Sequence, residues 1–145
     1  MPSKTKEAPV APREPFAYAL IRVVPHVARG ECLNVGVVLF CRSRRFLAAR
    51  MAPDRRRLLA LTPNLDLPAV ERRLDLIARV CAGDRAAGPM ARWPQAERFG
   101  WVVAPASTIV QPGPVHAGLT YDPAATLDHL VQTMVLIDGA DTRAD

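Results

Sequence analysis

The sequence predicts an α+β protein: a single domain built on a mainly antiparallel sheet, with helices packed on one face. Strand-like runs come first along the chain, helical periodicities follow, and short extended segments precede a last helix, an order typical of segregated elements. The chain has 145 residues of which 50% are hydrophobic, enough to bury one core. We expect the domain to span residues 16–137, between a flexible leader at 1–15 and a flexible tail at 138–145.

The first three elements are predicted to be strands. Residues 16–24 (FAYALIRVV) end before Pro25. Residues 34–41 (NVGVVLFC) are almost wholly apolar and β-branched, a composition typical of a strand that is buried on both faces. The Arg-Ser-Arg tripeptide at 42–44 is short enough for a hairpin turn, so residues 45–51 are expected to pair as the third strand.

Helices are predicted in the middle of the chain. Pro53 begins and Pro63 ends a first stretch that is rich in arginine and leucine. Residues 66–81 are predicted to form a second helix, because apolar residues recur there at helical spacing and Gly83 follows. Residues 91–100 (ARWPQAERFG) are ambiguous, and a short helix is one interpretation.

The C-terminal third is predicted to hold two short extended segments and a last helix. Residues 108–111 and 115–120 flank a Pro-Gly-Pro tripeptide, which indicates a turn or a sheet edge and not a central strand. Asp122 is placed to cap a helix that begins with Pro123 and runs to about Ile137. One apolar stripe of this helix comprises Leu127, Leu130, Met134 and Ile137.

The composition bears on which partners, cellular location and cofactors to expect. The net charge is +5, but the 19 basic residues are 17 Arg and 2 Lys, a bias that a GC-rich genome gives to any protein. Nucleic acid is therefore a conceivable partner that is not favoured. Since no apolar run approaches the ~18 residues of a membrane span and the leader has no apolar signal-peptide core, we expect no membrane association and a cytoplasmic location. Three scattered cysteines and three scattered histidines indicate reduced thiols and no metal site, and no cofactor is expected.

Five of the seven candidate binding residues lie in or between the first two predicted strands. They are Arg22, His26, Arg29, Glu31, Asn34, Ser107 and His116. Arg22 stands among apolar neighbours and needs a carboxylate partner if its face is covered, and Glu31 is the nearest one in sequence. An Arg22–Glu31 pair that fixes the loop is the structural interpretation, and binding of an anion or a partner is the functional one.

No catalytic residue is assigned. Cys32 with His26 or His116 offers a thiol and a base, but no known nucleophile motif surrounds it, so a buried and inert Cys32 is expected. Ser107 with His116 likewise lacks a GxSxG or SxxK motif. The prolines within residues 111–118 remove amide donors that a phosphate-binding loop needs.

Two further sets of residues each have two interpretations. Arginines cluster after the second predicted strand: Arg42, Arg44, Arg45, Arg50, Arg55, Arg56 and Arg57. They form either a solvated surface or a site for phosphate or an acidic protein face. The aromatic residues Trp93, Phe99 and Trp101 are expected to anchor the core, whereas an exposed pair would indicate an interface.

Two blocks of the sequence form a recognisable motif. The first is Tyr18-x3-Arg22-x2-Pro25 followed by Arg29-Gly30-Glu31-x2-Asn34-Val35-Gly36-Val37. The second is Ser107-Thr108-Ile109-Val110-Gln111 followed by Val115-His116-x-Gly118 and Asp122-Pro123. Together they resemble a bacterial family catalogued as a domain of unknown function, over about residues 16–137. The resemblance implies an association with genes for HipA-like kinases, and hence an accessory or antitoxin-like protein whose partner is encoded nearby.

Three functions remain open from the sequence. The favoured hypothesis is a non-enzymatic accessory protein that binds another protein. The first alternative is a small enzyme that gathers Arg22, Glu31 and His116 in one cleft, within about 10 Å of one another. The second alternative is nucleic-acid binding through the arginine-rich hairpin.

Overall fold

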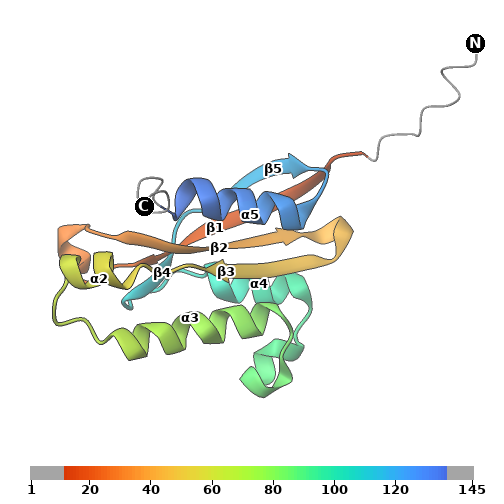
Figure 1. Cartoon of the computed structure of the whole chain (residues 1–145). Helices are drawn as coiled ribbons and strands as arrows, with labels where there is room; N and C mark the ends of the chain where they lie inside the picture. The colour runs from red at the N-terminus through yellow and green to blue at the C-terminus, as the bar shows by residue number, and fades with distance from the viewer. Residues whose placement is uncertain (1–11, 137–145) are drawn as a thin grey trace, which may run out of the picture.

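The computed structural model describes residues 12–136, which form a five-stranded antiparallel sheet and four α-helices (Figure 1). The strands are β1 (Glu14–Val23), β2 (Leu33–Cys41), β3 (Phe46–Met51), β4 (Val110–Pro112) and β5 (His116–Thr120). The helices are α2 (Arg55–Leu61), α3 (Leu67–Cys81), α4 (Gln95–Val103) and α5 (Pro123–Met134). These elements confirm the predicted α+β class and the antiparallel sheet. None of these helices combines the length and the apolar character that crossing a membrane requires.

The sheet has the order β3-β2-β1, and β4 and β5 both pair with the other edge of β1. β4 pairs with residues 21–23 and β5 with residues 14–18, and both run antiparallel to β1. They therefore form one sheet edge that is interrupted at residues 113–115. At the interruption, the Gly113 N–H still donates to the Leu20 carbonyl at 2.8 Å. The Pro-Gly-Pro tripeptide thus lies in a sheet edge, where a missing amide donor is tolerated.

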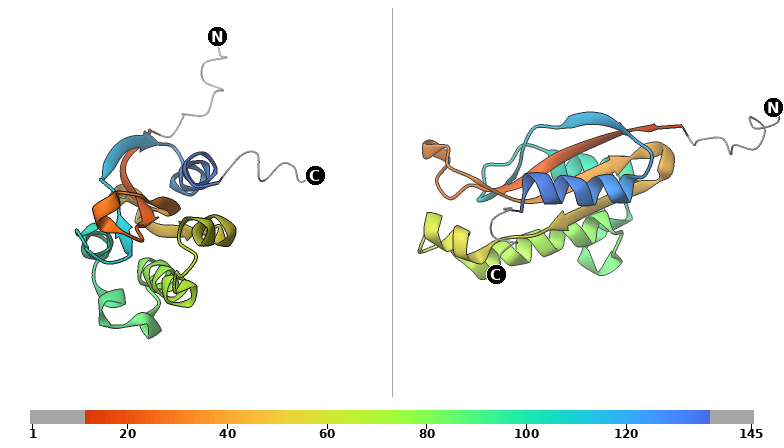
Figure 2. Two further views of the ribbon diagram at one scale, coloured as in Figure 1. Left: turned by 90° about the vertical axis from the view of Figure 1, so that its left-hand side faces the viewer. Right: turned by 45° about the horizontal axis from the view of Figure 1, so that its top comes forward.

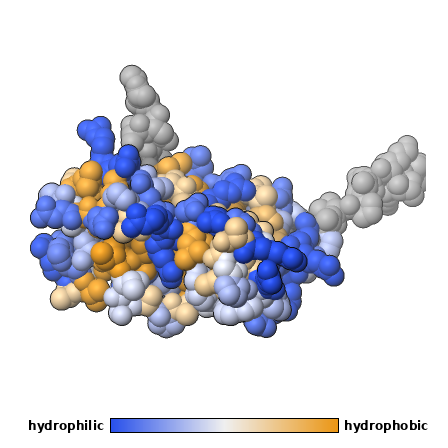
Figure 3. Space-filling model, turned by 90° about the horizontal axis from the view of Figure 1, so that it is seen from below, coloured by the Kyte–Doolittle hydropathy of each residue, from blue (hydrophilic) through white to orange (hydrophobic). Residues whose placement is uncertain are grey.

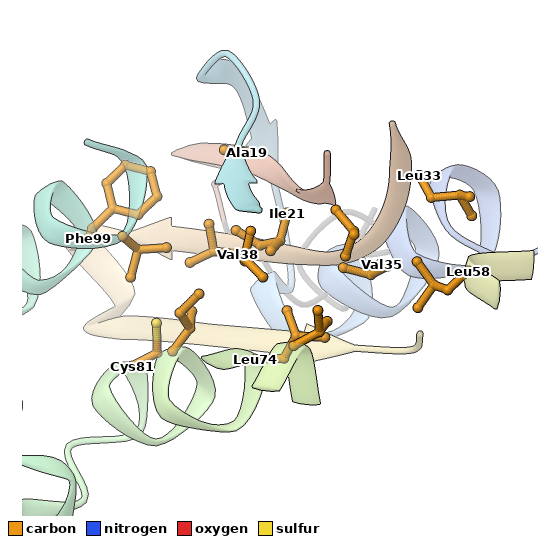
Figure 4. Close-up of a cluster of buried hydrophobic side chains, with 14 of the residues drawn as sticks. Ala19, Ile21, Leu33, Val35, Val38, Leu58, Leu74, Cys81 and Phe99 are labelled. Atoms are coloured by element: carbon orange, nitrogen blue, oxygen red, sulfur yellow. The ribbon is translucent and has the colours of Figure 1, made fainter. Parts of the chain in front are cut away.

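Helices cover both faces of the sheet, which corrects the prediction of helices on one face (Figure 2). α3 and α4 pack on one face and α5 packs on the other. The reason lies in β2, because its buried side chains are divided between two apolar clusters. Val35 and Val38 belong to the larger cluster with Leu74 of α3, shown in Figure 4, whereas Val37 packs with Leu127 of α5. A strand that is buried on both faces needs cover on both.

Gly36 allows β2 to approach β3 closely. The register between β1 and β2 shifts at this point, since Ile21 pairs with Gly36 but Arg22 pairs with Asn34. A Cβ atom on Gly36 would lie only 2.8 Å from the backbone oxygen of Arg50. The bulge and the close contact both explain why glycine occupies this strand position.

The ends of the domain differ in detail from the prediction. β1 begins at Glu14, so residues 14–15, which were expected in the leader, pair with β5 instead. α5 has the predicted cap, because the Asp122 carboxylate accepts a hydrogen bond from the Ala125 N–H at 3.3 Å. The helix ends at Met134, which is exposed, and Val135 is buried in its place. The predicted leader at 1–11, Ile137 and the predicted tail at 138–145 lie outside the described residues.

The ambiguous segment 91–100 forms the end of a short 3₁₀ turn, η4 (Pro89–Arg92), and most of α4. Of its aromatic residues and those that follow, only Phe99 is fully in the core, where its ring stacks with Phe40 at 5.4 Å. Trp101 is half-buried and Trp93 is exposed. The prediction that all three aromatic residues anchor the core is therefore wrong for Trp93.

Candidate functional site

The predicted site residues do not converge on one cleft. Arg22 and Asn34 are neighbours across β1 and β2. His116 pairs with Tyr18 instead, four residues from Arg22 along β1, which corresponds to roughly 13 Å at the usual rise of a strand. Ser107 is exposed in the segment that precedes β4. The strand register thus gives no support to the cleft of Arg22, Glu31 and His116.

The loop between β1 and β2 contains a different ion pair from the one predicted. Its 3₁₀ turn, η1 (Val27–Arg29), places the Arg29 guanidinium 3.1 Å from Glu31, and both side chains are well exposed. His26 is also exposed. Glu31 therefore pairs with Arg29 and not with Arg22. An exposed pair of this kind contributes little to stability, so the loop remains an accessible surface.

Arg22 is left without a charged partner among residues 12–136. Its Nε atom is buried and has no hydrogen-bond acceptor there. Its guanidinium lies against the backbone of Gly113, where an added Cβ would stand 2.9 Å from Cζ. Asn34, its neighbour on β2, donates to the Met134 carbonyl at the end of α5 at 3.1 Å. A buried guanidinium nitrogen without an acceptor is a cost to folding.

The thiols and imidazoles are dispersed. Cys32 is exposed, which contradicts the buried position expected for it, while Cys41 and Cys81 are buried. The His116 ring packs against Tyr18 with the ring centroids 5.3 Å apart. Within residues 12–136 no group of three His, Cys, Asp or Glu side chains has the arrangement of a metal site.

A concave surface lies between α3 and the chain that leads into β4. A cavity of about 590 Å³ is formed by Asp66, Ala69, Val70 and Arg73 with residues 108–110. A second cavity, of about 220 Å³, adjoins it between α3, Trp101 and β4, and the two share Arg73 and Val110. We call the two cavities together the α3 groove. Figure 3 views the molecule from the α3 side and shows apolar side chains gathered between charged ones.

Arg73 and Asp66 give the α3 groove its charge. The Arg73 guanidinium lies over the Trp101 ring, with Cζ 5.2 Å from the centroid, and no carboxylate of residues 12–136 lies within 4.0 Å of it. Asp66 caps α3 by accepting a hydrogen bond from the Ala69 N–H at 3.1 Å. The groove therefore has an acidic end and an arginine at the junction of its two cavities.

The C-terminal end of α3 carries a second charged cluster with a structural role. Asp84 accepts hydrogen bonds from Arg79 Nε at 2.8 Å and from the Ala86 N–H at 3.0 Å. The bond from Arg79 and the one from Ala86 together lower the pKa of the Asp84 carboxyl. Nearby, burial raises the pKa of the Cys81 thiol to about 12. A thiol held neutral in this way is not a nucleophile.

The arginine cluster of the sequence is divided in space. Arg42, Arg44 and Arg45 lie at the turn between β2 and β3, whereas α2 follows the far end of β3, roughly 20 Å away at the usual strand rise. Two of the remaining arginines have carboxylate partners: Arg50 pairs with Asp128 and Arg55 with Glu71. The fold thus breaks one run of positive charge into separate parts.

A comparison with known protein families identifies the family to which the sequence belongs. Over residues 18–135 the sequence matches the family described as "Protein of unknown function (DUF3037)". The chain belongs to this family. The match confirms the predicted resemblance to a family of unknown function. It covers nearly all the helices and strands of the structure. No curated protein and no solved structure matches the chain.

Sequence reasoning missed the main residues of the α3 groove in this DUF3037 protein. Arg73 is one of several arginines on the polar side of a predicted helix, and nothing in its spacing distinguishes it. Trp101 was expected in the core, and Ile109 was assigned to a short extended segment at a turn or sheet edge. The one usable signal was an apolar residue, Ile109, in a segment assigned to a sheet edge, and it is 42% exposed.

Proposed function

We propose that this member of the DUF3037 family is a non-enzymatic, cytoplasmic accessory protein that binds another protein through the α3 groove. The observation that carries the proposal is the lining of the groove, where exposed Ile109 and half-buried Ala69 lie beside Arg73 over the buried side chains of Val70 and Val110. An exposed apolar groove with a few polar groups at its rim is typical of a site for a partner segment.

The arrangement of polar residues supports binding over catalysis. A nucleophile and a base need to be within hydrogen-bond reach of each other. Cys32 precedes β2 at the end where Leu33 pairs with Val23, whereas His116 pairs with Tyr18, five residues away along β1. The division of the arginine cluster likewise argues against the hypothesis of nucleic-acid binding, because a phosphate-binding surface gains affinity from many adjacent cations. An antitoxin-like partner of a HipA-like kinase, which the family resemblance implies, fits the same proposal.

Co-expression with the product of the adjacent gene tests the proposal. We expect the two proteins to co-purify, and we expect Ile109→Asp to weaken the complex about tenfold or more by burying a charge in the groove. Leu59→Asp is the matched control, since Leu59 is a comparably exposed apolar residue on α2 that does not line the groove. Equal loss of binding in both variants would contradict the proposal, as would a complex that neither substitution weakens.

A further inference from the structure

We infer that the segment bound in the α3 groove carries an acidic side chain that pairs with Arg73, beside an apolar side chain that lies in the larger cavity. The inference rests on the proposed function and specifies the chemistry of the partner. Arg73 lines both cavities, so a carboxylate that reaches it lies at the junction of the groove.

Arg73 combines a free charge with a place in the groove. Arg79 has carboxylates at 2.8 Å and 3.7 Å, and Arg55 has one at 3.2 Å, whereas Arg73 and its neighbour Arg72 have none among residues 12–136. Of these two, Arg73 lines both cavities and Arg72 lines neither. The contact with Trp101, which lines the smaller cavity together with Arg73, restricts the motion of the guanidinium. An arginine that is already restricted loses less entropy when it binds, and its planar donors match a carboxylate.

Asp66 sets the orientation of the partner segment along the groove. It lies seven residues before Arg73, which is about two helical turns or ~10 Å along α3. Its carboxylate repels a second acidic group at that end of the groove. Three residues of an extended segment also span about 10 Å. The acidic residue of the partner is therefore expected at Arg73, with a basic or neutral residue three positions away at Asp66.

The larger cavity accounts for the apolar part of the segment. Its volume is about 590 Å³, and its walls include exposed Ile109 beside buried Val70 and Val110. These apolar walls favour an aliphatic or aromatic side chain. The expected segment thus combines one apolar anchor with a neighbouring carboxylate.

A phage-displayed library of random twelve-residue peptides, selected against the full chain, tests this chemistry. We expect the selected peptides to share an acidic residue close to an apolar one, and a Glu→Gln or Asp→Asn change in the peptide to weaken binding about tenfold. Arg73→Glu is expected to cause a similar loss, and a peptide with lysine at the acidic position should recover it. Arg72→Glu, the same charge change on an exposed neighbour outside the groove, is expected to have little effect.

The outcomes separate this inference from the proposed function. Peptides that lose binding in Ile109→Asp but tolerate Arg73→Glu and carry no acidic preference would overturn the acidic pairing while leaving the groove as a binding site. Peptides that bind independently of both Ile109 and Arg73 would overturn both. Thermal unfolding of each variant, together with the milder Arg73→Gln, verifies that losses arise at the groove and not from misfolding.

Discussion

The Arg73 guanidinium lies over the Trp101 ring, with Cζ 5.2 Å from the ring centroid, and so joins α3 to α4 at the wall of the groove. We predict that Arg73→Gln lowers the free energy of unfolding by about 0.5–1 kcal/mol, the usual value of an exposed cation–π contact. In a Trp93→Phe background, Trp101 is the one remaining tryptophan, and its fluorescence emission should change when Arg73 is replaced by Gln. Arg72→Gln is the control. An equal effect of both substitutions would show that the contact between Arg73 and the Trp101 ring does not contribute to stability.

Gly36 cannot be replaced without moving two strands. We predict that Gly36→Ala destabilises the protein by about 1–3 kcal/mol in urea denaturation, because its Cβ would stand 2.8 Å from the Arg50 backbone oxygen and backbone atoms cannot rotate away. Gly100→Ala is the control. Gly100 lies within α4 with no atom within 4 Å of an added Cβ, so alanine there should stabilise the helix by about 0.5–1 kcal/mol.

Arg22 is expected to cost stability in the isolated protein. Methionine preserves the apolar stem but removes the buried Nε that has no acceptor among residues 12–136, so Arg22→Met should raise the free energy of unfolding by about 1 kcal/mol. Arg44→Met, at an exposed turn, should change it by less than about 0.5 kcal/mol. A loss of stability in Arg22→Met would show that the guanidinium makes a favourable interaction that outweighs its desolvation.

The Arg79–Asp84 pair makes part of the stability pH-dependent. Because the pKa of Asp84 is lowered in the folded protein, its contribution is present above the ordinary carboxyl pKa of about 4 and is lost as the pH falls toward the folded value. We predict that the difference in melting temperature between the wild type and Asp84→Asn shrinks as the pH is lowered from about 6 to about 3. A difference that stays constant over that range would contradict a stabilising role of the ionised Asp84 carboxylate.

The three cysteines should react with thiol reagents at very different rates. At about pH 8 we expect Ellman's reagent to label exposed Cys32 rapidly in the native protein, and Cys41 and Cys81 only after unfolding. Burial raises the pKa of Cys81 to about 12, so unfolding allows that thiol to ionise and the folded state loses stability as the pH rises above about 9. Cys32→Ser should abolish the rapid phase and leave the slow one unchanged.

Local patterns in the sequence determined most of the secondary structure. The β-branched run gave β2, the Asp122-Pro123 pair gave the start of α5, and the prolines after Gln111 indicated a sheet edge. These predictions succeeded because caps, prolines and side-chain periodicity act over a few residues. The family resemblance also depended on sequence alone, and the family match confirmed it.

Only the tertiary structure decided which side chains meet. The burial of β2 on two faces required a helix on each, the register shift beside Gly36 placed Arg22 opposite Asn34, and Glu31 pairs with Arg29 instead. The α3 groove brings Arg73 to residues 108–110, which are more than thirty positions away in the chain. Contacts over such a separation depend on how whole elements pack, and no local pattern encodes them.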